Sequence, residues 1–155
     1  MQPAADLSPN AQTAICEALN QAVAETAVTT MLAQNFHWNV KGMAFGPLHA
    51  LFQEIYEDHF VAQDDLAERI KALDGHAEGM LAAMVARSKV GEHDGHADDK
   101  TMIEALKVAQ ETLAATVGAA GALAAEHGDT LTEDLCIARG QTHEKFAWML
   151  RAHLR

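Results

Sequence analysis

Basic residues are scarce in this sequence, and their scarcity argues against a surface that binds nucleic acid. Eleven Lys and Arg face 22 Asp and Glu, which gives a formal net charge of -11 at pH 7. Residues 1–12 contain no Lys or Arg, and the last seven residues contain only Arg151 and Arg155. Because DNA is a polyanion that attracts clustered cations, direct DNA binding is not expected. The acidic excess suits a protein that attracts cations, although many ordinary proteins are also acidic.

Proline, aromatic residues, long apolar runs and paired cysteines are also rare. Three Pro and 5% aromatics, against 49% hydrophobic residues, permit long and closely packed helices. The length favours one domain, 1–155, and strand-like alternation is absent, so the expected class is all-α. No run of about 18 apolar residues could cross a membrane, and no secretory signal is present, so the cytoplasm is the expected location. Cys16 and Cys136 are isolated, which favours buried free thiols.

Helical periodicity predicts four long helices after a short N-terminal tail of about residues 1–8. The expected helices run from Ser8-Pro9 to His37, from about Leu48 to Leu73, from Asp98-Asp99 to Gly128, and from Thr130 onward. Ser8 before Pro9, and Thr130 three residues before Glu133, are typical helix starts. The segment from Gly42 to Pro47 indicates a break.

The connection between the second and third of these helices is much longer than the others and separates two helical hairpins. It contains a short apolar piece at 80–85, where a short extra helix is expected, and the polar run 92–99. We interpret the polar run as a solvated linker despite its histidines and carboxylates. Two hairpins joined by one long crossover predict a ferritin-like four-helix bundle. The expected core residues are Ile15, Leu19, Val23, Thr26, Ala33, Leu48, Leu51, Phe52, Ile55, Ala62, Leu66, Ile70, Leu73, Ile103, Leu106, Leu113, Val117, Ala120, Leu123, Leu135, Ala138, Phe146, Met149 and Leu150.

Four residues of the first two helices have side chains that suit a transition metal: His37, His49, Asp64 and Glu68. Asp64 follows His49 by 15 residues in one expected helix, a rise of roughly 22 Å, so one chain cannot bring them to one ion. No histidine follows a Glu by three residues, so the Glu-x-x-His pattern of an intra-bundle di-iron site is absent.

A second copy of the chain would solve this distance problem. His49, Gln53, Tyr56, Phe60 and Asp64 fall within about 80° of one another on the second helix. Antiparallel packing on this stripe would place His49 opposite Asp64 and Glu68 of the partner, with Tyr56 and Phe60 in the centre of the seam. The alternatives are that the carboxylates only solvate a surface and that the histidines are structural.

These residues resemble the signature of the Dps family (DNA-binding proteins from starved cells), the mini-ferritins. The matching pattern is His37-Trp38, a second histidine twelve residues later at His49, and Asp64-x-x-x-Glu68 fifteen residues after that. The resemblance covers essentially the whole chain, including the ending from Gly128. It implies a hollow homo-dodecamer built from two-fold dimers. In this shell Fe²⁺ would be oxidised, preferably by hydrogen peroxide rather than oxygen, and stored as ferric mineral.

The resemblance also implies roles for individual residues. His37 and His49 of one subunit would bind iron together with Asp64 and Glu68 of its two-fold mate, and Trp38 would lie beside the site. Asp134, with Asp129 as a weaker candidate, would line a pore, and Glu54 and Glu57 would nucleate mineral. The family usually has a carboxylate where this chain has Gln53, so one firm and one weak iron position are expected.

The family's DNA binders often carry a Lys-rich N-terminal tail, which this chain lacks. Protection of DNA is therefore expected to come from removal of iron and peroxide in a bacterial cytoplasm. Two alternatives remain: a nucleoid-associated structural protein with little catalysis, and a shell that binds zinc or another ion without redox turnover.

Overall fold

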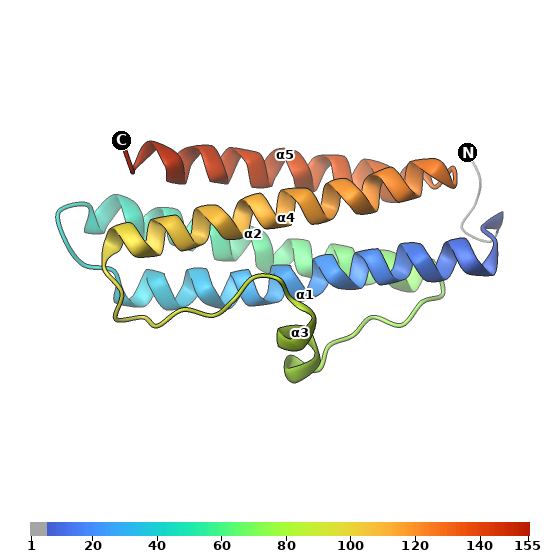
Figure 1. Cartoon of the computed structure of the whole chain (residues 1–155), viewed down its shortest axis with the longest axis horizontal. Helices are drawn as coiled ribbons and strands as arrows, with labels where there is room; N and C mark the ends of the chain where they lie inside the picture. Colours follow the sequence, from blue (N-terminus) through green and yellow to red (C-terminus); the bar gives the residue numbers. More distant parts are fainter. Residues whose placement is uncertain (1–5) are drawn as a thin grey trace.

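The computed structural model describes residues 6–155, which form four long helices and one short helix (Figure 1). The helices are α1 (Pro9–Asn39), α2 (Phe45–Ala72), α3 (Leu81–Arg87), α4 (Asp99–Glu126) and α5 (Thr130–Ala152). The α1–α2 hairpin packs beside the α4–α5 hairpin, and the crossover between them carries α3 along α1 (Figure 1). The predicted all-α bundle with one crossover is confirmed. The first five residues of the predicted tail lie outside the described residues. No described helix is both long and apolar enough to span a membrane.

Local chemistry at the helix ends explains where three of the long helices begin. Ser8 caps α1 and accepts a hydrogen bond from the Ala11 backbone N–H, as expected from the sequence. Asp98 caps α4 in the same way. The predicted Thr130 cap of α5 is wrong by one residue, because Asp129 accepts the bond from the Thr132 backbone N–H.

The predicted start of α2 at Leu48 is also wrong. The helix begins at Phe45, and Pro47 lies inside its first turn. The first turn tolerates proline because its N–H groups have no partner within the helix. Gly42 supplies the turn before it with a positive φ of 110°. The extra turn adds Phe45 to the helix that carries His49.

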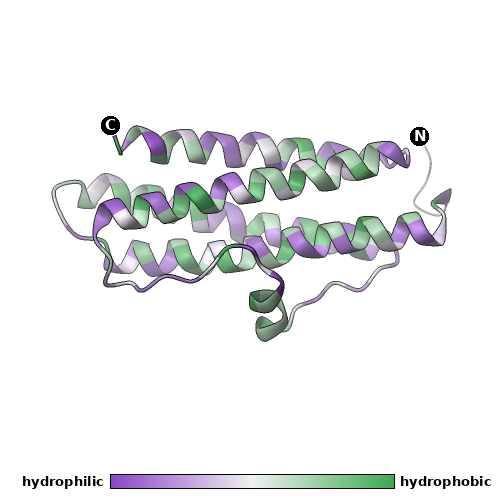
Figure 2. Ribbon diagram, in the orientation of Figure 1, coloured by the Kyte–Doolittle hydropathy of each residue, from purple (hydrophilic) through white to green (hydrophobic). Residues whose placement is uncertain are grey.

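The core comprises two clusters of buried apolar residues, one toward each end of the bundle. One is centred on Phe36, Phe52 and Leu106, and the other on Leu19, Leu66 and Val117. Apolar residues recur along every long helix between polar ones (Figure 2). Most of the predicted core is confirmed, but Ala138 is exposed, and Leu123, Leu135 and Met149 are only half-buried.

Polar side chains of α1 hold the crossover against the bundle. Asn20 donates to the His76 carbonyl and accepts from the Glu78 backbone N–H. Gln21 donates to the Arg87 carbonyl. The fully buried Glu25 accepts bonds from Gln21, from the Lys89 backbone N–H and from the Thr116 hydroxyl of α4. These bonds give the irregular backbone of the connection its partners and fix the position of α3.

A second polar network crosses the middle of the bundle between α2, α4 and α5. Gln110 donates to His59 Nε2 and accepts from His143 Nδ1, and all three side chains are fully buried. His59 Nδ1 donates to Asp58, which also accepts two bonds from Arg139. The network therefore links the two hairpins with side chains that have specific partners.

Acidification should destabilise the protein through these two histidines. Burial lowers the pKa of His59, and burial together with nearby positive charge lowers the pKa of His143 to about 2. Their folded forms therefore stay neutral, whereas the unfolded forms take up protons below about pH 6.5. The free energy of unfolding should fall from pH 6.5 toward pH 4.5, by up to about 1.4 kcal/mol per pH unit for each histidine.

Denaturant titrations across this pH range would measure how steeply the free energy of unfolding falls with pH. His143→Leu should reduce that slope by the contribution of one histidine. An unchanged slope in that variant would contradict the assignment. Asp58 does not contribute to this slope. Although burial alone would raise its pKa, hydrogen bonds from His59 and Arg139 hold that pKa well below its usual range. Its stabilising effect is therefore lost only below about pH 4.

Candidate metal centre

The structure brings His37 and His49 together where the end of α1 meets the start of α2. His37 Nδ1 donates to the backbone carbonyl of His49 at 2.7 Å, and His49 Nδ1 donates to the carbonyl of His37 at 2.7 Å. A carbonyl can only accept a hydrogen bond, so both Nδ1 atoms carry the proton in this arrangement. Each Nε2 atom then has a free lone pair. This is the tautomer that a metal requires, fixed by a hydrogen bond at the other ring nitrogen.

Aromatic stacking holds the two imidazoles in a fixed orientation. The rings of His37 and His49 are stacked with their centroids 3.7 Å apart and their planes within 14°. Phe45 stacks on the other face of His49 at 5.0 Å, and the Tyr56 ring meets His37 at 5.2 Å and a steep angle. Phe45 was not among the predicted site residues, because it lies in the segment that the sequence analysis interpreted as a break.

The stacking also determines how the two histidines can bind ions. The lone pair of an imidazole nitrogen lies in the plane of its ring. An ion shared equally by two parallel rings 3.7 Å apart would lie roughly 1.8 Å out of each plane. That displacement is close to the whole metal–nitrogen bond length of about 2.1 Å, so the shared geometry is poor. The arrangement therefore suits two neighbouring ions with one histidine each.

The predicted carboxylate ligands are placed farther along α2, away from the histidine pair. Asp64 and Glu68 are both exposed. Within residues 6–155, no three His, Cys, Asp or Glu side chains come close enough to hold a metal ion. Gln53 lies one turn after His49 and donates to Glu57 at 2.8 Å, whereas Glu54 is exposed.

An exposed apolar face lies beside one of these carboxylates, Asp64. Phe60 is 72% exposed and Trp38 is 61% exposed. Two neighbouring grooves share Phe60 and Gln63; one also contains Asp64, and the other contains Trp38 and the α3 residue Leu81. Isolated exposed apolar residues are common, but a contiguous group of this kind indicates an interaction surface. Tyr56 does not belong to it, because its ring is half-buried against the core of its own chain.

The remaining predicted residues lie elsewhere. Asp134 is exposed on α5, whereas Asp129 is buried, caps that helix and forms an ion pair with Arg69 at 2.9 Å. The Asp129 carboxylate is thus engaged within its own chain, which favours Asp134 of the two pore candidates. Both cysteines are buried free thiols, as expected.

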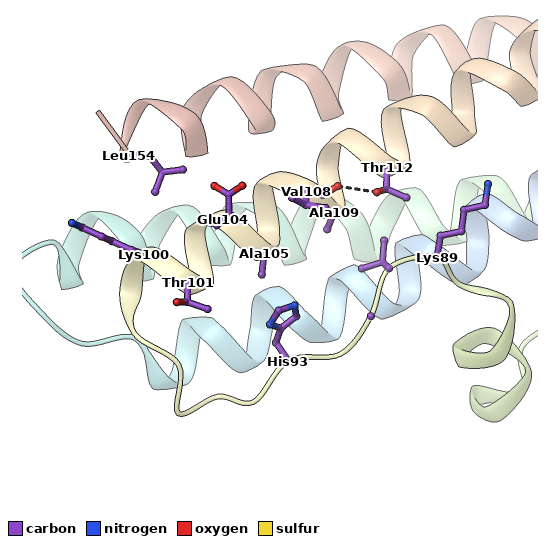
Figure 3. Close-up of a pocket in the computed structure, with 12 residues that line it drawn as sticks. Lys89, His93, Lys100, Thr101, Glu104, Ala105, Val108, Ala109, Thr112 and Leu154 are labelled. Carbon is purple, nitrogen blue, oxygen red and sulfur yellow. Dashed lines mark hydrogen bonds between the residues drawn. The ribbon is translucent and has the colours of Figure 1, made fainter.

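A separate groove of about 520 Å³ lies between the crossover and α4 (Figure 3). His93 from the crossover and Lys100 and Glu104 from α4 lie along it. It contains none of the predicted ligands. The polar run 92–99 beside it is mostly exposed, as predicted for a solvated linker.

Comparison of the sequence with known proteins identifies the family of this chain. The sequence model of the ferritin-like domain matches residues 16–155. Over 140 residues the chain is 34% identical to general stress protein 20U of Bacillus subtilis, covering 90% of this chain and 97% of that protein. It is 33% identical over 140 residues to DNA protection during starvation protein 2 of Bacillus anthracis, covering 90% and 96%. The chain belongs to the Dps family of ferritin-like proteins.

Solved Dps structures agree with this assignment throughout the bundle. The Dps protein of Vibrio cholerae O1, described as a member of a superfamily of ferritin-like diiron-carboxylate proteins, superimposes with a TM-score of 0.91 at 31% identity. That match covers 96% of this chain and 94% of the other. The Dps protein of Bacillus brevis gives a TM-score of 0.92 at 31% identity, covering 96% and 100%. Membership of the Dps family supports a role in iron storage or DNA protection.

Proposed function

We propose that this Dps protein oxidises Fe²⁺ at sites shared between two subunits and stores the ferric product inside a dodecameric shell. The observation that carries the proposal is the reciprocal hydrogen bonding of the buried His37 and the half-buried His49, which leaves the Nε2 lone pair of each ring free. Structural histidines that only stabilise a helix end would not need both lone pairs free. Imidazole and carboxylate together form a ligand set that suits iron.

The missing half of each site comes from a two-fold partner in this proposal. Antiparallel packing of two α2 helices places Asp64 and Glu68 of the partner subunit against His37 and His49. The exposed face with Phe60 and Trp38 supplies apolar area for this contact. Two-fold symmetry repeats every contact, so each dimer contains two equal sites. Carboxylates stabilise the ferric product and histidines retain Fe²⁺, which is the substrate.

We also propose the oxidant, a cation route and a position facing the mineral. Hydrogen peroxide is the preferred oxidant, Asp134 lines a route for cations, and Glu54 faces the mineral. Trp38 lies next to His37 in sequence and on the proposed dimer face. By consuming iron and peroxide together, the protein would protect DNA in a bacterial cytoplasm without coating it.

A crystal soaked anaerobically in Fe²⁺ and measured at the iron absorption edge tests the proposal directly. We expect anomalous peaks between His37 and His49 of one subunit and Asp64 and Glu68 of its mate. Peaks confined to another part of the shell would refute the site. Zinc bound at the same place, without oxidation of added Fe²⁺ by peroxide, would favour the non-redox alternative.

Direct DNA binding should be absent. The net charge of -11 would repel a polyanion, and residues 1–12 offer no cationic tail. Plasmid DNA mixed with the metal-free protein at low salt should migrate unshifted in a gel. Clear retardation under those conditions would instead favour a nucleoid-associated structural role.

A further inference from the structure

The groove between the crossover and α4 has an apolar floor with a lysine at each end (Figure 3). Ala105, Val108 and Ala109 of α4 line its middle, and Val108 is 49% exposed. Lys100 and Lys89 lie at opposite ends, and neither forms an ion pair within the described part of the chain. Two free cations on either side of an apolar floor suit an elongated ligand with negative charge at both ends.

The carboxylate along the groove does not cancel these two charges. Glu104 pairs with Lys107 at 2.7 Å. Lys107 is not one of the residues that line the groove, so the charge of Glu104 is compensated by a cation from outside it. The charges of Lys89 and Lys100 are therefore left for a ligand.

The wall that the crossover forms is held in place before any ligand binds. The Lys89 backbone N–H donates to the buried Glu25 of α1. The His93 carbonyl accepts a bond from Asn35, and the His93 ring meets the Phe36 ring at a steep angle, 6.3 Å between centroids. A groove whose walls are already fixed loses little conformational entropy when it binds a ligand, which favours affinity.

The backbone of the same wall favours a peptide as the ligand. Residues 91–94 have no regular secondary structure. The N–H groups of Gly91, Glu92 and His93 donate to no other backbone group in the part of the chain that the structure describes. An exposed run of such groups can hydrogen-bond to the backbone of an added peptide. A peptide with acidic ends can use these groups and both lysines at once, because its own carbonyls lie between its carboxylates.

We propose that this groove binds an extended acidic peptide segment of a partner protein, with one carboxylate at each lysine and small apolar side chains over Val108. The groove follows α4 from Lys100 to Thr112, a rise of roughly 18 Å. An extended peptide advances about 3.3 Å per residue, so a segment of about five residues spans the groove. The groove contains none of the proposed iron ligands, so the peptide would recruit the shell without altering Fe²⁺ oxidation.

Fluorescence anisotropy of a labelled peptide, measured on the assembled protein, tests the inference. The probe is a capped peptide of about five residues, with aspartate at both ends and alanine between them. We expect saturable binding that weakens as salt is raised, because exposed charges are screened. The same peptide with asparagine in place of aspartate should bind about tenfold more weakly, since both ion pairs are lost. Equal binding of the two peptides would overturn the role of charge.

Three lysine variants locate the binding on the protein. Lys89→Ala and Lys100→Ala should each weaken the acidic peptide about threefold, and together about tenfold, as expected for exposed ion pairs. Lys145→Ala removes an exposed lysine of α5 that does not line the groove, and it should leave the binding unchanged. Equal weakening in all three single variants would show an effect of net charge alone and overturn the site.

A further variant and a competitor test the floor and the peptide backbone. Val108→Glu changes an exposed residue and places a carboxylate in the middle of the groove, so the acidic peptide should bind more than about tenfold more weakly. Unchanged binding in this variant would overturn the groove as the site. Octanedioate carries two carboxylates and no amides, and it should not displace the peptide at equal concentration. Displacement would overturn the peptide in favour of a small dicarboxylate.

Discussion

Two inactive variants of this protein should restore activity to each other when they assemble together. Asp64→Ala, Glu68→Ala removes the carboxylates, and His37→Ala, His49→Ala removes the imidazoles. Each variant alone should lose on the order of 100-fold or more in Fe²⁺ oxidation by peroxide, because even outer partners of metal ligands contribute roughly 10–100-fold. A dimer that contains one chain of each kind has one site with all four ligands and one site with none.

Random reassembly makes this expectation quantitative. Half of the dimers in an equal mixture are mixed, and half of the sites in a mixed dimer are intact, so about a quarter of the unmodified activity should return. The measurement is the initial oxidation rate after joint unfolding and refolding, with each variant refolded alone as the control. A mixture that contains mixed dimers by native mass spectrometry and still lacks activity would show that the halves do not meet across a two-fold axis.

Replacing Gln110 with Met should destabilise the folded protein by about 2–6 kcal/mol. The substitution keeps roughly the same volume and removes the amide that pairs with both His59 Nε2 and His143 Nδ1. Each buried polar atom left without a partner costs about 1–3 kcal/mol, and two atoms are affected. Urea unfolding at neutral pH and fixed protein concentration measures the change, since assembly makes the midpoint depend on concentration.

A triple variant gives the matched control for this prediction. His59→Leu and His143→Leu added to Gln110→Met replace all three members of the chain by apolar residues. Removal of both partners of a hydrogen bond is much less costly than removal of one, so the triple variant should regain part of the lost stability. A single Gln110→Met variant as stable as the unmodified protein would show that the network contributes no stability.

The fold was largely predictable because the sequence repeats one physical pattern. Apolar residues at helical spacing, Ser8 as a cap and the long unpatterned stretch before Asp98 define two hairpins and their crossover. The predicted start of α2 was wrong because the position of a proline alone does not define where a helix begins. Pro47 looks like a helix start, yet the first turn of α2 accommodates it, so the helix begins at Phe45.

The candidate ligands could be predicted from the sequence, but the hydrogen bonds that fix the tautomers of the two histidines could not. His37 and His49 donate to each other's backbone carbonyls only because the end of α1 and the start of α2 lie at hydrogen-bond distance. The spacing of residues along the sequence does not predict that distance. The network through Gln110 was missed for the same reason. His59, Gln110 and His143 lie on three helices, and their side chains become partners only once the hairpins pack.

The position of Glu25 has a consequence for the order in which the chain folds. Of its three hydrogen-bond donors, only Gln21 belongs to its own helix, while the others come from the crossover at Lys89 and from Thr116 of α4. An early α1–α2 hairpin would therefore leave this carboxylate short of partners, and water would have to remain around it. The last water is expelled only when the second hairpin arrives. Glu25 thus favours cooperative packing of both hairpins in one step. A stepwise route, in which the α1–α2 hairpin excludes water before the second hairpin packs, is disfavoured.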